Sequence, residues 1–358
     1  MFIINLHKIH TNIAFMCKCS SMKVAILSDQ INGHLNQSLG IIKLLESDYE
    51  VNVEIINIRL KNHYLRSIHQ FILKHLGNNL NKKNAEKIIS FYKPFEFKDF
   101  DLIVSTGGKL AALNAALAKK YSIYNIQNGS LRGNPTTNYS AIIVDQISTE
   151  ANGIFTLIPP NKYMPIKLKK RKNKALFLLG GNGSGYKIKK KDINVLCFSI
   201  EKFVKEGGLQ PIIITSRRTK KSHERIMKDN LFHLLDQQSV WFNDDRKSTD
   251  LNRYFEKSEL IFVTEDSSMM IAESISSGLP VNTIAPIRRK KSRQHTEMLQ
   301  RYEIQGFIKR LNFSSDFHGE AKKIASGYEK IMNIKLDLKM KIFEKINLYS
   351  FKSKRIKI

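Results

Sequence analysis

The segment from Leu260 to Pro286 constrains the fold of this chain more than any other part of the sequence. It begins with an apolar run, Leu260–Val263, which is typical of a buried parallel strand. Asp266, Ser267 or Ser268 can then cap a helix, and a glycine and a proline end that helix before a second apolar run. Such a turn directs unpaired backbone N–H groups and the positive end of a helix dipole at whatever lies above the sheet. The segment therefore predicts an α/β fold with an anion site at this strand end.

Strand-like apolar runs alternate with helical patterns through most of the chain, which indicates parallel sheets covered by helices. In the first half these runs lie at 23–27, 51–58, 102–104, 124–126 and 141–144. In the second half they lie at 175–179, 211–215, 240–242, 260–263 and 281–284. The sequence predicts two Rossmann-like domains that face a cleft.

The domain boundaries follow from this alternation and from changes in composition. We expect a first domain at 22–166, a basic linker at 167–173, a second domain at 174–319 and a basic helical C-terminal segment at 320–358. Residues 1–21 are an uncertain extension or a mis-called start, because MKVAILSD from Met22 has the pattern of a natural beginning. A cleaved signal peptide is the rival interpretation, but polar residues interrupt its apolar positions and no cleavage site is convincing. We expect a cytoplasmic protein.

The net charge of the chain is +27, from 59 Lys and Arg against 32 Asp and Glu. Such a charge attracts phosphate-rich partners, although codon bias from an AT-rich genome accounts for part of it. An anionic membrane surface is an expected partner, whereas nucleic acid is not, because the basic clusters lack interleaved aromatic platforms. No run approaches the roughly 18 apolar residues that span a bilayer. Three cysteines argue against a disulfide framework or a zinc site.

Two turns in the first half carry candidate chemistry. Asp29 and Gly33–His34 follow the first strand, so His34 can act as a general base on an acceptor hydroxyl. A lone histidine is more often structural, and Asp29 can simply cap the turn. Gly107, Gly108 and Lys109 follow a later strand, where Lys109 either holds an acceptor phosphate or packs its apolar stem.

The second half offers three sites for a phosphorylated ligand. The glycine turn Gly180–Gly185 follows a clean strand, but it is not a P-loop because Tyr186 occupies the position of the required lysine. Arg217 and Arg218 lie in the turn at the end of the next strand, where guanidinium groups match phosphate oxygens, although a solvated surface pair is the alternative. Glu273 lies in the helix that follows Ser268, close enough to accept hydrogen bonds from ribose hydroxyls.

Taken together, these turns resemble the mitochondrial fission elongated-mitochondria family, whose bacterial members are regarded as glycosyltransferases of lipopolysaccharide or lipooligosaccharide core synthesis. The matching residues, in the family's order, are Ser28–Asp29, Gly33–His34, Gln37, Thr106–Lys109, Gly180–Asn182, Thr215–Arg218, Val263–Ser267, Met269, Glu273, Gly278 and Pro280–Val281. The segment from Leu260 to Pro280 also looks like the donor helix of the peptidoglycan N-acetylglucosaminyltransferase.

The resemblance implies a GT-B glycosyltransferase architecture, with the acceptor bound by the first domain and a nucleotide-sugar donor by the second. It also implies that neither a metal nor a separate cofactor is needed. On this hypothesis His34 is the catalytic base, with Asp29 as an orienting or acceptor-binding group. The expected acceptor-side residues are Gly33, Gln37, Gly107, Gly108 and Lys109. The expected donor-side residues are Gly181, Asn182, Ser184, Arg217, Arg218, Asp266, Ser267, Ser268 and Glu273.

The leading hypothesis is therefore transfer of a sugar from a nucleotide sugar to a lipid-linked or lipopolysaccharide core acceptor. The protein would be peripheral on the cytoplasmic face of an inner membrane. The alternative is a non-catalytic adaptor that binds a protein partner or a membrane surface through its basic faces, because plant members of the family act as adaptors for a dynamin-related protein.

Overall fold

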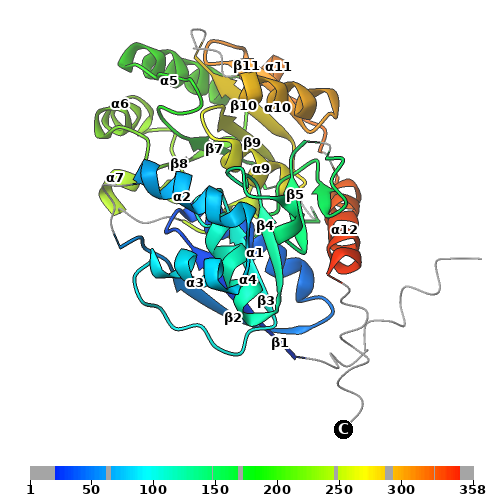
Figure 1. Cartoon of the computed structure of the whole chain (residues 1–358). Coiled ribbons are helices and arrows are strands. Elements are labelled where there is room, and N and C mark those ends of the chain that lie inside the picture. Colours follow the sequence, from blue (N-terminus) through cyan, green and yellow to red (C-terminus); the bar gives the residue numbers. More distant parts are fainter. Residues whose placement is uncertain are drawn as a thin grey trace, which may run out of the picture. The chain divides into compact units, whose positions relative to one another are not determined.

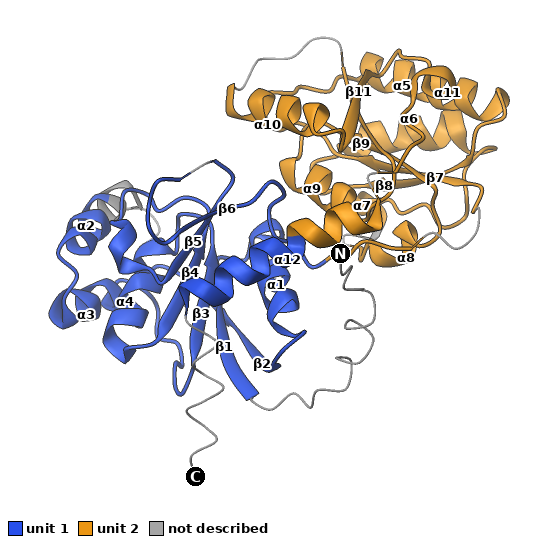
Figure 2. Cartoon of the chain, turned by 90° about the vertical axis from the view of Figure 1, so that its right-hand side faces the viewer, with its two compact units in different colours: residues 1–162, 335–358 blue, residues 163–334 orange. Residues whose placement is uncertain are grey.

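The computed structural model describes residues 21–61, 66–146, 148–167, 172–245, 249–286, 293–325 and 327–346. The chain divides into two compact units, unit 1 (residues 1–162 and 335–358) and unit 2 (residues 163–334), which Figure 2 distinguishes by colour. Apart from Ser21, the predicted extension at 1–21 lies outside the described residues, and so do residues 168–171 of the predicted linker. Unit 1 ends its first segment at Lys162, whereas the sequence places the end of the first domain at residue 166.

The described part of unit 1 contains a six-stranded sheet in the spatial order β2-β1-β3-β4-β5-β6 (Figure 2), and every neighbouring pair is parallel. Figure 1 colours the same elements by their position along the chain. Its strands are β1 (Ser21–Ser28), β2 (Glu50–Asn57), β3 (Leu102–Thr106), β4 (Tyr124–Asn128), β5 (Ala141–Val144) and β6 (Gly153–Phe155). Its helical elements are α1 (Asn32–Leu45), α2 (Arg66–Asn78), α3 (Lys82–Ser90), α4 (Ala111–Tyr121), the 3-10 turn η2 (Thr136–Asn138) and the later part of α12 (Tyr328–Lys345).

Helices cover both faces of this sheet, because its central strands are apolar on both sides. On one face Ile41 of α1 and Ile342 of α12 join a buried cluster with Val24 and Val104. On the other face α3 and α4 pack against the sheet through a second buried cluster that includes Leu113. The chain therefore returns from unit 2 to complete the core of unit 1 with α12.

The described part of unit 2 contains a five-stranded parallel sheet in the order β11-β10-β9-β7-β8. Its strands are β7 (Lys174–Leu179), β8 (Gln210–Thr215), β9 (Leu260–Thr264), β10 (Val281–Ala285) and β11 (Ile308–Asn312). Its helices are α5 (Lys190–Lys205), α6 (Lys221–Leu231), α7 (Phe242–Asp245), α8 (Asn252–Phe255), α9 (Ser268–Ser276), α10 (Arg293–Ile304) and α11 (Phe317–Glu320).

Aromatic side chains fill the core of unit 2. The rings of Phe177 on β7 and Phe262 on β9 stack with centroids 4.6 Å apart. Phe203 of α5 meets Phe262 edge-on at 5.5 Å, and Phe317 of α11 stacks on it at 4.9 Å. Offset and edge-to-face rings of this kind add to the stabilisation that burial alone provides. These contacts fix the centre of the sheet, from whose strand ends the candidate ligand turns extend.

The predicted α/β class with two Rossmann-like parallel sheets is confirmed. One predicted strand, at 240–242, is wrong: Val240 forms only an isolated bridge to Ile214, and helix α7 begins at Phe242. The structure adds β6 and β11, which the sequence did not predict. In β11 only Ile308 and Leu311 are buried, and Lys309 and Arg310 lie between them, so it lacks the continuous apolar run of a central strand.

Candidate functional site

Each sheet has one point at which the order of its strands reverses. In unit 1 the chain runs from β1 to β2 on one side and then returns to β3 on the other side of β1. In unit 2 it runs from β7 to β8 and then returns to β9 on the other side of β7. Ligands of open parallel sheets bind outside the carboxyl ends of the strands at such switch points. The turns after β1 and β3, and those after β7 and β9, are therefore the candidate sites.

The turn after β1 holds a hydrogen-bonded pair, Asp29 and His34. Nδ1 of His34 lies 3.1 Å from both carboxylate oxygens of Asp29, and Nζ of Lys109 lies 3.6 Å from Oδ2 of the same carboxylate. Burial would raise the pKa of Asp29, but the hydrogen bond from His34 and the charges of His34 and Lys109 outweigh it and hold the pKa below its ordinary value. The structure thus brings together the two residues predicted as base and orienting group.

The hydrogen bond to Asp29 involves Nδ1 of His34, so the second ring nitrogen, Nε2, lies on the side of the ring away from Asp29. Among the described residues, none forms a hydrogen bond with this Nε2. The His34 side chain is 33% exposed, whereas that of Asp29 is 6% exposed. A buried carboxylate that orients a half-exposed imidazole is the arrangement that a general base requires.

Gly107 and Gly108, in the turn after β3, lie directly beneath two basic side chains. A Cβ on Gly107 would lie 2.4 Å from Cε1 of His34, and a Cβ on Gly108 would lie 2.4 Å from Cγ of Arg132. Gly107 also has φ +81°, which disfavours any other residue. Both predicted glycines therefore allow basic groups to approach the turn. Arg132 was not predicted, although a basic residue between two glycines after a strand is a signal that could have identified it.

The two remaining acceptor-side candidates lie on α1. Gly33 is in its first turn, next to His34. The side-chain oxygen of Gln37 accepts a hydrogen bond of 2.7 Å from Nδ2 of Asn128, at the carboxyl end of β4. Gln37 therefore links α1 to the sheet edge on which the other candidates lie.

In unit 2, Gly180 and Gly181 follow β7 and pack against the turn after β9. The N–H of Gly180 donates to Oγ1 of Thr264 at 2.7 Å, and the N–H of Gly181 donates to Oδ2 of Asp266 at 3.1 Å. A Cβ on Gly181 would lie 1.9 Å from the carbonyl oxygen of Arg218. The close approach of three backbone turns at the switch point therefore requires glycine at this position.

Asp266, one of the predicted donor-side residues, lies against Gly180. Its side chain is fully buried, and its Oδ2 lies 2.8 Å from Nη2 of Arg218. Oγ1 of Thr264 donates to the other carboxylate oxygen at 2.6 Å. Burial raises the pKa of Asp266 above its ordinary value, against the opposing effects of Arg218 and Thr264. The carboxylate of Asp266 thus holds the glycine turn and Arg218 in place. It does not cap α9, because the N-cap of that helix is Ser267.

Asn182 and Ser184 also support the glycine turn. Oδ1 of Asn182 accepts a hydrogen bond of 3.0 Å from the N–H of Ile188. The hydroxyl of Ser184 donates to the carbonyl oxygen of Asp266 at 3.1 Å. These bonds hold the turn in place, and direct contact of either side chain with a ligand stays a prediction.

The two arginines after β8 differ in their surroundings. Arg218 is anchored by Asp266 and its side chain is 35% exposed. Arg217 is exposed, and no carboxylate of the described residues lies within ion-pair distance of its guanidinium group. Arg217 is therefore the arginine whose charge is available to an anion.

The start of α9 carries the last three donor-side candidates. Oγ of Ser267 accepts a hydrogen bond of 3.4 Å from the N–H of Met270, as expected for an N-cap. Oγ of Ser268 lies 3.1 Å from Nδ1 of His295. Glu273 is buried within α9, where its charge acts with burial to raise the pKa of Tyr163.

A buried polar network lies behind these turns and was not predicted from the sequence. Arg310 donates two hydrogen bonds to the carboxylate of Glu265, from Nε to Oε1 at 2.7 Å and from Nη2 to Oε2 at 3.0 Å. Glu265 also accepts hydrogen bonds from Tyr186 and Thr283. Burial would raise the pKa of Glu265, but these partners hold it below its ordinary value. The network ties the glycine turn to β9, β10 and β11.

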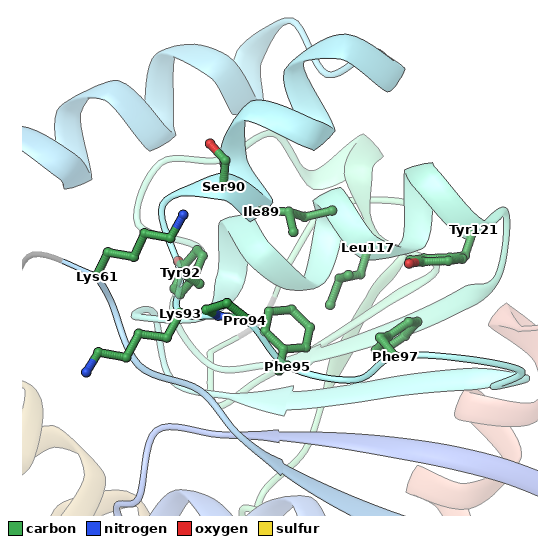
Figure 3. A pocket seen from close by; sticks show the side chains of 10 residues that line it. All are labelled: Lys61, Ile89, Ser90, Tyr92, Lys93, Pro94, Phe95, Phe97, Leu117 and Tyr121. Carbon is green, nitrogen blue, oxygen red and sulfur yellow. The ribbon is translucent and has the colours of Figure 1, made fainter.

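A separate cavity of about 230 Å³ lies in unit 1, and Figure 3 shows its mainly aromatic and aliphatic lining. The lining residues are Lys61, Ile89, Ser90, Tyr92, Lys93, Pro94, Phe95, Phe97, Leu117 and Tyr121. None of the predicted site residues lines it. In the described part of the chain, no group of three or more His, Cys, Asp or Glu side chains is placed to hold a metal ion. No described helix is both long and apolar enough to cross a membrane.

Several solved structures are similar to this chain at low sequence identity. The calicheamicin glycosyltransferase CalG4 is similar with a TM-score of 0.50 and 9% identity, over 94% of this chain and 100% of that one. The glycotransferase of kitacinnamycin has a TM-score of 0.47 and 11% identity, over 93% of this chain and 99% of that one. MurG of Acinetobacter baumannii has a TM-score of 0.44 and 12% identity, over 91% of this chain and 95% of that one. The fold is of the GT-B type.

No curated protein matches the sequence. The family model described as mitochondrial fission ELM1 matches residues 32–331, which are most of the chain. This chain belongs to the mitochondrial fission ELM1 family.

Proposed function

We propose that this protein is a glycosyltransferase that moves a sugar from a nucleotide-sugar donor to a lipid-linked or lipopolysaccharide core acceptor. The observation that carries the proposal is the Asp29–His34 pair at the switch point of unit 1. A buried carboxylate bound to Nδ1, with Nε2 available, equips His34 to remove a proton from a hydroxyl group. A histidine that only filled a core would have no need of this half-exposed position.

The chemistry of such a transfer assigns a role to each group. Nε2 of His34 accepts the proton of the acceptor hydroxyl while the acceptor oxygen forms a bond to the anomeric carbon of the donor sugar. The bond between that carbon and the diphosphate oxygen breaks, and the nucleoside diphosphate leaves with the bonding electrons. Asp29 stabilises the imidazolium cation that forms and keeps the ring in position. Attack opposite to the leaving group inverts the anomeric centre.

The donor side of the proposal rests on the switch point of unit 2. The glycine turn at Gly180 and Gly181 brings backbone close to the entrance of α9, and Arg217 supplies an exposed guanidinium group nearby on the neighbouring strand end. Helix N-termini and arginines stabilise diphosphates through N–H donors and positive charge. Negative charge that develops on a departing nucleoside diphosphate would be stabilised by these same groups.

The acceptor side of the proposal is supported by charge. Lys109 lies beside Asp29 and Arg132 lies beside Gly108 in unit 1, and the whole chain carries a net charge of +27. A lipid-linked or lipopolysaccharide acceptor bears phosphate or carboxylate groups and is held in a membrane with an anionic surface. We therefore propose a peripheral position at the cytoplasmic face of an inner membrane, where this charge attracts both acceptor and surface.

A thermal-shift screen against UDP, GDP, CMP and ADP sugars tests the donor half of this function. Binding to the native state raises the melting temperature by mass action, so one nucleotide class should raise it and the others should not. Arg217→Ala should remove most of the shift. Arg225→Ala, an exposed arginine on α6 that lies 3.8 Å from Asp229, is the matched control and should leave it intact. No shift with any donor at saturation would instead favour the non-catalytic adaptor.

A further inference from the structure

The side chain of His295 joins the turn after β9 to the first residue of α9. His295 lies on α10 and is only 7% exposed. Its Nε2 lies 2.6 Å from the carbonyl oxygen of Glu265, and its Nδ1 lies 3.1 Å from Oγ of Ser268. A carbonyl oxygen can only accept a hydrogen bond, so Nε2 carries a proton. The tautomer of the ring is thereby set by the backbone of β9.

The environment of His295 favours the neutral ring. Burial lowers the pKa of His295 and is the strongest influence on it. The hydrogen bond to the Glu265 carbonyl and the charges of Glu265 and Asp266 act in the opposite direction, while the charge of Arg310 acts with burial. The ring of Tyr186 meets the imidazole edge-on at 6.0 Å and adds no charge. Because burial holds the pKa of His295 below its ordinary value, the ring is neutral at pH 7 and Nδ1 is a hydrogen-bond acceptor.

A neutral His295 fixes the direction of the hydroxyl of Ser268. Because Nδ1 has no proton, the O–H of Ser268 must donate to it. The half-buried Oγ of Ser268 then offers only lone pairs to a ligand at the start of α9. Phosphate oxygens are acceptors and cannot form a hydrogen bond with this oxygen, whereas a ligand hydroxyl can donate one to it. The positive end of the α9 helix dipole is left for the anion.

We propose that Ser268 accepts a hydrogen bond from a sugar hydroxyl of the donor, and that His295 is the positioning residue that fixes this polarity. The hydroxyl belongs either to the ribose of the nucleotide or to the transferred sugar, since both present the same donor group. This inference rests on the proposed function, because it requires a bound nucleotide sugar. It divides the start of α9 into a backbone surface for phosphate and a side-chain contact for a hydroxyl.

Calorimetric titration of the wild type and of Ser268→Ala tests the contact. The ligands are the nucleoside diphosphate that the donor screen identifies, its 2′-deoxy and 3′-deoxy forms, its sugar conjugate and inorganic pyrophosphate. Ser268→Ala should weaken ligands that carry the hydroxyl by about twofold to tenfold, the loss of one neutral hydrogen bond. Pyrophosphate should bind unchanged. If a deoxy nucleotide is insensitive to the substitution, the ribose is the source; if only the sugar conjugate is sensitive, the transferred sugar is.

Two substitutions at His295 test the positioning role. His295→Asn places an amide oxygen near the position of Nδ1 and should retain most of the affinity, whereas His295→Gln lacks an acceptor there and should behave like Ser268→Ala. A second measurement does not depend on whether the variants fold. In the wild type at pH 7, ¹⁵N NMR should show a proton on Nε2 of His295 and none on Nδ1. A proton on Nδ1 would overturn the proposal.

The outcomes separate this inference from the function on which it rests. If the wild type binds no nucleotide, the proposed function fails and the inference fails with it. If the wild type binds a nucleotide and Ser268→Ala weakens pyrophosphate as much as the nucleotide, Ser268 contacts phosphate and only the inference is overturned.

Discussion

Two adjacent carboxylates, Glu265 and Asp266, follow strand β9, and burial acts on both of them. At Glu265 the guanidinium group of Arg310 makes two contacts, at 2.7 and 3.0 Å, and the pKa falls below its ordinary value. At Asp266 Arg218 makes a contact at 2.8 Å, and burial raises the pKa. A paired geometry of two parallel hydrogen bonds is the stronger of the two arrangements. The difference identifies Glu265 as the carboxylate whose ionised form stabilises unit 2.

Replacing Glu265 with Gln tests this assignment through the pH dependence of stability. Since the folded pKa lies below 4.5, the ionised group stabilises the fold above about pH 4.5, and this stabilisation is lost as the pH falls through the folded pKa. Glu265→Gln should lower the free energy of unfolding at pH 7 by roughly 3 to 5 kcal/mol and flatten its fall in acid. Urea unfolding from pH 7 to pH 3 measures both effects.

The matched control for that experiment is Glu297→Gln. Glu297 pairs with Arg293 on the surface of α10, where solvent screens the pair. This substitution should leave the acid limb of the stability curve as it is in the wild type. An acid limb that is equally steep in Glu265→Gln would show that Glu265 does not carry the effect.

Gly181→Ala tests the close approach of the turns at the switch point of unit 2. The added Cβ would lie 1.9 Å from a backbone oxygen, and backbone cannot move aside as a flexible side chain can. Overpacking of this kind costs about 1 to 3 kcal/mol, and nucleotide binding should be lost with it. Gly207→Ala, where φ is +84° and nothing lies within 4 Å, isolates backbone strain and should retain binding. Equal binding by both variants would contradict the role given to Gly181.

At the scale of elements, α12 stabilises unit 1 although it comes from the far end of the chain. Leu338, Ile342, Phe343 and Ile346 are buried against the sheet of unit 1. Ile342→Ala should lower the free energy of unfolding by about 2 to 5 kcal/mol, because a fully buried side chain leaves a cavity. Met340→Ala, on the same helix but 57% exposed, should change it by less than about 0.5 kcal/mol. Thermal or urea unfolding compares the two, and similar losses would rule out the packing described for α12.

The elements that the sequence predicted best are those with continuous apolar runs. β9 was predicted at 260–263 and is observed at Leu260–Thr264, because a strand buried on both faces needs an unbroken run of apolar residues. β11 was missed because this edge strand has only two buried positions, which two basic residues separate. Val240–Phe242 was wrongly predicted as a strand, since three apolar residues have no periodicity that distinguishes a bridge from a strand.

The candidate site was predictable only where the sequence places its residues in turns after strands. Asp29 and His34 are five residues apart, so a single turn brings them together. Arg310 is 45 residues from Glu265, and His295 is 30 residues from the same residue. Those contacts depend on how β10, α10 and β11 pack, which no local pattern reveals. The buried position of Asp266 likewise depends on Arg218, which follows a different strand.

At the scale of the whole molecule, the charge of +27 predicts binding to anionic membranes that depends on salt. The protein should co-sediment with vesicles of phosphatidylglycerol and phosphatidylcholine at low ionic strength. The bound fraction should fall steeply as salt shortens the Debye length below its value of about 10 Å at 0.1 M. Vesicles of phosphatidylcholine alone are the control and should bind little protein at any salt concentration. Equal binding to both kinds of vesicle would remove the electrostatic basis of the membrane proposal.

The central claim is that His34, oriented by Asp29, removes the acceptor proton during sugar transfer. The most direct measurement is the rate of nucleotide release from the identified donor in the presence of a lipopolysaccharide-containing membrane extract. His34→Ala should lower the rate about 100-fold or more, and Asp29→Asn should lower it too, while calorimetry shows donor affinity unchanged in both. A wild type that binds the donor and releases nucleotide at the same rate as His34→Ala would contradict the account.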